Sequence, residues 1–216
     1  MKKLLRVLAA QLFAAALVLT AFSGPARADD TSPSDAELAL EWQNTWDTYK
    51  FYEFAPPPLP ESGRSRDKRS ISIEIDAPVD HVFPAYSNIN NHIGLHPFLK
   101  RVATHRDWCQ GDTRYINFTA VEEIPYQGTI VTSNTHAQQR INRAGLYYET
   151  DTWSLPNVVT HQKIIFEAVA GGKTKVTEHL TFDADTSLID FVVTNGVASH
   201  EQTQAILKQA IESGQL

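Results

Sequence analysis

Apolar and polar residues alternate with a two-residue period through much of the chain, which is the pattern of half-buried β-strands. In the segment 70–76, Ile71, Ile73 and Ile75 fall on one face. Further runs of strand character follow at 99–106, 113–124, 128–140, 146–153, 158–169 and 173–182. Short turn signals separate them, at Gly111, 142–145, 156–157 and 171–172. The pattern predicts an antiparallel meander.

Helical patterns occur on both sides of this meander. Segments 80–87 and 88–97 predict two short helices, and Pro84 is expected to kink or break the first. The segment 187–213 predicts one long C-terminal helix, interrupted near Asn195-Gly196 and restarted by the capping box Ser199-x-x-Gln202. Its inward stripe comprises Ile189, Val193, Val197, His200, Gln204, Leu207 and Ile211.

An antiparallel sheet of this size must bury one face, and one long helix is available to cover it. We therefore predict an α+β fold in which a curved antiparallel sheet of about six to seven strands wraps around the C-terminal helix. Because a curved sheet that grips one helix cannot close completely, we expect an apolar cleft between them, a common kind of small-molecule site.

Residues 29–69 predict an N-terminal extension in front of a domain at 70–216. A capping box, Ser34-x-x-Glu37, predicts the start of a helix that ends near Phe54. The Pro-rich stretch 55–60 and the polar residues that follow predict a semi-rigid linker up to the domain. One stripe of the helix carries Leu38, Trp42, Trp46 and Tyr49.

This aromatic stripe has three interpretations. The first, which we expect, is docking of the helix on its own domain. The helix is alternatively a removable lid or a membrane-surface helix, although few basic residues flank the stripe, so any membrane contact is expected to be weak. It is alternatively the docking element of a protein-interaction module whose partner is unknown.

The first 28 residues have the pattern of a secretory signal peptide. Lys2, Lys3 and Arg6 precede an apolar run, 7–22, and an Ala-x-Ala triplet ends at Ala28. A transmembrane anchor is the alternative, but the run is shorter than the ~20 residues that span a bilayer. We expect cleavage after Ala28 and a periplasmic location, with secretion as the alternative.

Loss of this segment removes four basic residues and no acidic one, so the formal net charge changes from −6 to −10. A chain this acidic is a poor nucleic-acid binder, since neutralisation of phosphates dominates that affinity. Cys109 is the single cysteine, so no disulfide can form within the chain, and we expect a free thiol without catalytic function.

Two titratable residues carry the candidate chemistry. In the last strand, Glu178 falls among the inward apolar residues Val176, Leu180 and Phe182, where a carboxylate needs a partner or a raised pKa. One interpretation places Glu178 at the solvated rim of the sheet, and the other makes it a polar handle or a general base. His200 faces inward from the long helix, so the two side chains could meet; a satisfied core histidine is the alternative.

Further residues with inward directions are expected to line the cleft or to form the core. They are Phe83, Tyr86, Phe98, Arg114, Ile116, Phe118, Tyr148, Trp153, Phe166 and Phe191, together with Leu180 and Phe182. His92 and His96 have helical metal-ligand spacing, and His136, His161 and His179 lie on three other strands, with His179 facing outward. No third ligand is evident for zinc, so no metal and no cofactor is expected.

The pattern Ile73-x-Ile-x-Ala-Pro-Val-x-x-Val-Phe83 and the last strand around Thr174-Lys-Val-Thr-Glu178, which leads into a long helix, resemble the START-like (SRPBCC) helix-grip superfamily. The resemblance extends over residues 69–213. This superfamily includes polyketide cyclases, lipid-transfer domains and coenzyme Q-binding proteins. The resemblance implies a hydrophobic ligand between sheet and helix, and it carries no invariant catalytic set.

These observations favour an exported, non-enzymatic protein that binds or carries a lipid, sterol, quinone or polyketide-like aromatic. Glu178, His200, Arg114 or Tyr148 would orient the ligand. The alternative is a cofactor-free cyclase- or hydrolase-like enzyme with Glu178 and His200 as its acid/base pair. The interaction module with the aromatic helix is the third hypothesis.

Overall fold

The computed structural model describes residues 33–51, 58–96, 98–126 and 129–216. Within these residues the alternating segments form the strands of one sheet: β1 (Arg64–Ile75), β2 (Leu99–Gln110), β3 (Thr113–Tyr126), β4 (Thr129–Asn142), β5 (Tyr147–Ser154), β6 (Val158–Val169) and β7 (Lys173–Asp185). The helices are α1 (Asp35–Tyr49), α2 (Val79–Ser87) and α3 (Ile189–Glu212), and the 3-10 turns are η2 (Pro60–Ser62) and η3 (Ile89–His92).

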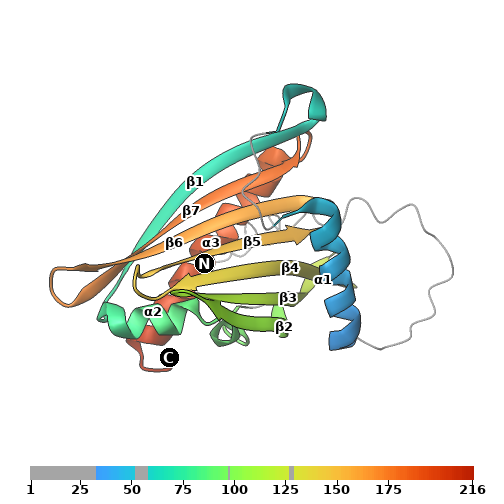
Figure 1. The fold of residues 1–216 in the computed structure, drawn as a ribbon. Coiled ribbons are helices and arrows are strands. Elements are labelled where there is room, and N and C mark those ends of the chain that lie inside the picture. Colours follow the sequence, from blue (N-terminus) through green and yellow to red (C-terminus); the bar gives the residue numbers. More distant parts are fainter. Residues whose placement is uncertain (1–32, 52–57, 97, 127–128) are drawn as a thin grey trace.

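The seven strands form a single sheet in the order β1-β7-β6-β5-β4-β3-β2, with every neighbouring pair antiparallel. Strands β2 to β7 form a meander, and β1 joins at its far edge beside β7. The sheet is curved, and α3 runs behind it from the β1 edge to α2 (Figure 1). The predicted helix-grip architecture is confirmed.

The sheet has an inner face, which α2 and α3 cover, and an outer face. Alternation assigns the side chains to these faces: Ile164 pairs with Glu178, and Phe166 with Val176, so all four point inward. The largest core cluster lies on this inner face, where Tyr86 of α2 and Leu207 of α3 pack with Phe166 and Val176.

Helix α1 packs on the outer face of the sheet (Figure 1). Its N-terminal capping box is present, because Ser34 and Glu37 bond each other's backbone amides. Leu38 packs on Ala103 and Val121, and Trp42 is 4% exposed and donates from Nε1 to the Ala137 carbonyl at 2.8 Å. The expectation that the aromatic stripe docks on its own domain is confirmed.

Two predicted boundaries in the N-terminal part of the chain were wrong. Helix α1 ends at Tyr49, because Lys50 has a left-handed backbone with φ of 51°. Strand β1 begins at Arg64 rather than at Ser70, so residues that we assigned to a linker belong to the sheet. The remainder of the predicted helix end and Pro-rich stretch, 52–57, lies outside the described residues.

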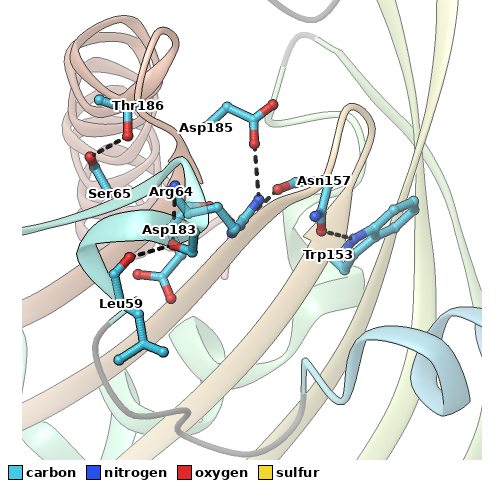
Figure 2. Close-up of polar contacts among 9 residues, drawn as sticks. Leu59, Arg64, Ser65, Trp153, Asn157, Asp183, Asp185 and Thr186 are labelled. Atoms are coloured by element: carbon cyan, nitrogen blue, oxygen red, sulfur yellow. Dashed lines mark hydrogen bonds and ion pairs between the residues drawn. The ribbon is translucent and has the colours of Figure 1, made fainter.

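Ion pairs to distant residues hold the beginning of β1 in place. Figure 2 shows Arg64 reaching Asp185 and Asn157, with an Nη1–Oδ1 distance of 3.4 Å to Asp185 and an Nη2–O distance of 3.0 Å to Asn157. Arg66 makes a bidentate pair with Asp183, at 2.6 and 2.5 Å. These partners lie more than ninety positions away in the sequence, so local composition could not reveal the strand.

Helix α3 is continuous through Asn195-Gly196, and the predicted interruption was wrong. Gly196 has a packing role instead, since a Cβ atom there would lie 2.6 Å from the ring of Phe182. Helix α2 likewise continues through Pro84, so of the predicted kink or break the break is absent.

The predicted signal peptide, residues 1–28, lies outside the described residues, and the division into an extension and a domain stays a prediction. Within the described part of the chain, no helix is both long and apolar enough to cross a membrane.

Candidate functional site

The carboxylate of Glu178 is buried at the centre of the inner face. Alternation along β7 places it between Val176 and Leu180, which are 0% and 1% exposed. The side chain of Glu178 is itself only 4% exposed. The interpretation that Glu178 lies at a solvated rim was therefore wrong, and a charge at this depth needs partners.

Two side chains from different helices supply those partners. Tyr86, on α2, donates its hydroxyl proton to Glu178 Oε1 over 2.5 Å. His200, on α3, places Nδ1 2.8 Å from Glu178 Oε2. One strand and two helices therefore converge on a single carboxylate, and the meeting of Glu178 with His200, which the sequence left open, is present.

These partners decide the protonation state of the carboxylate. Burial alone would raise the pKa of Glu178, but the hydrogen bond and charge of His200 and the hydrogen bond from Tyr86 outweigh it, and the pKa is lowered. An ionised carboxylate only accepts hydrogen bonds, so Nδ1 of His200 carries the proton. The other ring nitrogen, Nε2, accepts a hydrogen bond when His200 is neutral and donates one when His200 is protonated.

Other groups around the carboxylate are held neutral. Burial, followed by the negative charge of Glu178, raises the pKa of Tyr86 and of Tyr148 well above 10, so both phenols stay protonated. The amide of Gln204, 2% exposed, lies close enough to help lower the pKa of Glu178. Its Nε2 nevertheless donates no hydrogen bond of good geometry within the described part of the chain.

A cavity of about 180 Å³ opens in front of this cluster. Its apolar wall includes Ile89, Leu99, Phe118, Ala120 and Ala137. Its polar wall is larger than we expected from the sequence and carries Glu122, Thr135, Gln139, Thr150, Thr152, Gln162, Ser199 and Thr203 beside Glu178 and His200. The cavity therefore suits an amphipathic molecule with several hydrogen-bonding groups better than a plain hydrocarbon.

Two further histidines, His92 and His96, also line this cavity. Burial lowers the pKa of both, and the charges of neighbouring histidines lower that of His96 further, so both rings are neutral near pH 7. His92 Nε2 lies 3.1 Å from the Tyr86 carbonyl oxygen. Among the described residues, no three His, Cys, Asp or Glu side chains are grouped as metal ligands.

Glu122 lies on the polar wall as a second carboxyl group of the cavity. Burial raises its pKa, and a hydrogen bond from Thr135 offsets part of this rise. Glu122 and Glu178 therefore differ in acidity within one cavity, because the interactions with His200 and Tyr86 outweigh burial at Glu178, whereas the hydrogen bond from Thr135 does not outweigh it at Glu122.

The predicted site residues separate into three groups. Tyr86, Phe118, Tyr148, Glu178 and His200 line the cavity together. Phe83, Phe166, Leu180 and Phe182 are buried in the apolar clusters of the inner face. The other five do not line the cavity: Ile116 is buried beside Phe118, and Arg114, Phe98, Phe191 and Trp153 lie farther away.

Trp153 is the clearest misassignment of a direction. It lies on the outer face, where Tyr49 of α1 stacks on its ring at 4.7 Å. Tyr148 and Trp153 are an odd number of positions apart on β5, so they cannot both point inward in a regular strand. Arg114 is exposed and pairs with Asp107, Phe98 lies beside His96, and Phe191 lines a small hollow near Leu155.

Several cavity residues escaped the sequence analysis, above all Gln139, Thr150, Thr152 and Gln162. A signal for them was present, because Thr150 and Thr152 share the parity of Tyr148 on β5. Polar residues at inward positions were not counted, since inward positions were expected to be apolar.

Two other hollows adjoin the sheet. The larger, about 590 Å³, lies on the inner face between α2, η3 and the β2–β3 hairpin. The smaller, about 170 Å³, lies on the outer face at the end of α1 and is lined by charged residues that include Arg64, Arg66 and Asp183. The bidentate pair of Arg66 with Asp183 satisfies both of its charges within the protein.

Neither a protein-family profile nor a curated protein sequence matches the chain. Several solved structures, however, are similar to the chain. The chain is similar to the Zhui aromatase/cyclase from Streptomyces sp. R1128, with a TM-score of 0.50 and 11% identity over 68% of this chain and 96% of that one. It is similar to Ara h 8.0201, with a TM-score of 0.53 and 17% identity over 69% and 99% of the two chains.

A START superfamily protein from Mycobacterium smegmatis gives a TM-score of 0.53 and 13% identity, over 68% of this chain and 97% of that one. At such identities the likeness concerns the fold. The sheet order, the gripped helix α3 and these three neighbours together establish that the chain has the START-like helix-grip fold.

Proposed function

We propose that this protein binds an amphipathic small organic molecule, of the lipid, sterol, quinone or polyketide-like aromatic classes, in the cavity between the sheet and α3. The observation that carries the proposal is the buried Tyr86–Glu178–His200 cluster opening into a cavity of about 180 Å³. A buried charge with two dedicated partners is a costly arrangement, and such arrangements are concentrated at binding and catalytic sites.

In this proposal the Tyr86–Glu178–His200 cluster orients the ligand, and the apolar wall of the cavity supplies affinity. Nε2 of His200 can accept a hydrogen bond from a ligand hydroxyl, because Glu178 fixes the proton on Nδ1. Phe118, Leu99 and Ile89 contribute affinity through apolar burial, at about 25 cal/mol per Å². The ligand would then lie with an oxygenated end at the carboxylate and its carbon skeleton along β3 and η3.

The direct test is native mass spectrometry of the protein purified from its own cells, followed by organic extraction of any bound molecule. We expect a discrete adduct that the variant His200→Gln loses or retains weakly. His179→Gln is the matched control, since His179 is the exposed histidine next to Glu178 on β7. Equal adduct levels in both variants would contradict the proposed orientation by His200.

A second function, acid/base catalysis on the bound molecule, is favoured by the same geometry. A histidine whose Nδ1 donates to a carboxylate is arranged to take a proton at Nε2, and the carboxylate stabilises the imidazolium that forms. A cyclase- or dehydratase-like reaction would need such a base. In that case Glu178→Gln and His200→Gln should abolish turnover of the extracted compound while leaving its binding measurable.

We also infer that the protein is exported, from the signal-peptide pattern of residues 1–28. N-terminal sequencing of the protein from the cell envelope should then begin at Asp29. Recovery of the intact N-terminus from the cytoplasm would contradict export.

A further inference from the structure

Two hollows lie on the same inner face and share a boundary. The carboxylate compartment is the cavity of about 180 Å³ at Glu178. The hairpin compartment is the hollow of about 590 Å³ beneath α2 and η3, lined by residues that include Phe83, Ser87, Ile116 and Ile141. Ile89 lines both compartments.

The boundary falls between successive inward positions on two paired strands. On β3, Phe118 lines the carboxylate compartment and Ile116 lines the hairpin compartment. On β4, Gln139 lines the carboxylate compartment and Ile141 lines the hairpin compartment. Because inward residues two positions apart on a strand lie about 7 Å from each other, the compartments are one side chain apart.

The side chain of Gln139 lies at this boundary. It is 4% exposed, and its Nε2 donates to the Ser87 carbonyl oxygen over 3.1 Å, which links β4 to the end of α2. Its Oε1 is buried without a hydrogen-bond partner among the described residues. An unpaired buried acceptor is unfavourable, so the closed position of Gln139 is not its best-satisfied one.

We propose that Gln139 is a gate that sets the length of the ligand, an inference that rests on the proposed function. A ligand with a hydroxyl head at His200 and an unbranched apolar stem would displace the Gln139–Ser87 bond and extend into the hairpin compartment. Four apolar side chains, Phe83, Ile89, Ile116 and Ile141, line that compartment, and its exposed rim carries Asn88, Asn90, Asp112, Arg143 and the Asp107–Arg114 ion pair. The ligand class is thus an elongated molecule with a polar head and an apolar tail.

Two phenols of different length test this proposal, 4-ethylphenol as the short probe and 4-hexylphenol as the long one, each titrated by calorimetry. The long probe should bind at least about tenfold more tightly, since each buried methylene group contributes about 0.8 kcal/mol. Cys109, the single cysteine of the chain and a lining residue of the hairpin compartment, reports occupancy. The long probe should slow its alkylation by N-ethylmaleimide, and the short probe should not.

Three variants distinguish the effect of Gln139 from the effects of other residues that line the two compartments. Gln139→Ala removes the side chain that forms the gate. It should raise the affinity for the long probe, relative to the short one, by a further ~5-fold or more, because the hydrogen bond to Ser87 no longer has to break. Thr150→Ala is the matched control, since Thr150 pairs with Gln139 across β4 and β5 and lines the carboxylate compartment alone. Thr104→Trp fills the hairpin compartment and should weaken the long probe without changing the short one.

The outcomes distinguish this inference from the proposed function. If the wild-type protein binds neither phenol, the proposed function itself is contradicted at this site. If the short probe binds but the long one gains no affinity and leaves Cys109 unprotected, the gate is wrong and the binding function stands. Equal effects of Gln139→Ala and Thr150→Ala on the preference for the long probe would also overturn the gate.

Discussion

Histidines take part in hydrogen-bonded clusters on both faces of the sheet, but the two clusters have different surroundings. On the inner face, Glu178 and His200 meet at the wall of a cavity. On the outer face, Thr119 Oγ1 lies 2.8 Å from His105 Nε2 and 2.9 Å from His136 Nδ1, and α1 covers the group.

The two clusters differ in what surrounds the histidine ring nitrogens. The ring nitrogens of His136 face protein on both sides, with Thr119 at 2.9 Å and the carboxylate of Glu41 on α1 at 3.9 Å. His200, by contrast, is held at Nδ1 by Glu178, and its side chain lines the cavity. Under the proposed function, a histidine serves ligand binding where its ring borders a cavity, and it has a structural role where protein contacts both of its ring nitrogens.

The largest expected effect comes from removing the inner carboxylate. Glu178→Leu removes the partner of the buried Tyr86 hydroxyl and of the half-buried His200 Nδ1–H, and should lower the free energy of unfolding by about 3–5 kcal/mol. Denaturant unfolding measures this loss. Thr119→Val, the nearly isosteric change at the centre of the outer cluster, should cost only about 1–2 kcal/mol, because neutral hydrogen bonds are lost. Equal costs would contradict the contrast between the clusters.

The next largest effect is expected in the layer that α1 adds to the outer face. Trp42→Ala removes a buried indole and its bond to the Ala137 carbonyl, at a cost of about 3 kcal/mol. The result should be release of α1 with the sheet intact. Hydrogen exchange should then be faster in residues 35–49 and unchanged in α3, and 4-ethylphenol should still bind. Loss of that binding would show that the outer layer supports the inner cavity.

Much of the inner site could be predicted from the sequence because it depends on local periodicity. The alternation of β7 placed Glu178 inward, and the stripe of α3 placed His200 on the same side. Tyr86 was expected to line the cleft, but its bond to Glu178 was not foreseen. That bond depends on how α2 is rotated against the sheet, which packing with Phe166 and Leu207 decides.

The outer face was less predictable, because it is held by contacts between residues far apart in the chain. The basic residues Arg64 and Arg66 resembled a solvated linker, and their partners near Asp183 come from the last strand. Trp153 was predicted to be a core residue of the inner face. It is a core residue of the outer face, where it packs beneath α1. Periodicity assigns a residue to one of two faces, and it does not say which face is the inner one.

Gly196 offers a smaller test, at the packing of α3 on the inner face. Glycine in a helix interior usually costs stability relative to alanine, so Gly196→Ala would be expected to stabilise a free helix. Here the added Cβ would lie 2.6 Å from a ring carbon of Phe182, which is 2% exposed, and overpacking should cost about 1–3 kcal/mol. A rise in the melting temperature of this variant would show that α3 can shift freely.

The smallest expected effect is a dependence of stability on pH that originates in the outer cluster. Burial, with a contribution from the charge of His105, lowers the pKa of His136 from 6.5 to about 4. Between these two pH values the unfolded chain binds a proton that the folded protein does not, so stability falls as the pH is lowered from 6.5 towards 4. The full shift corresponds to about 3 kcal/mol, and screening by solvent reduces the expected loss to about 1–2 kcal/mol.

Comparing wild type with His136→Gln isolates the contribution of His136, because every other titratable side chain is present in both proteins. Denaturant unfolding at pH 7.5 and at pH 4.5 should show a larger loss of stability in wild type, by about 1–2 kcal/mol. Hydrogen exchange should locate the loss in α1, whose Glu41 lies 3.9 Å from the ring. An identical pH dependence in both proteins would mean that His136 takes up its proton without opening the outer layer, and the contrast between the two clusters would then rest on Glu178 alone.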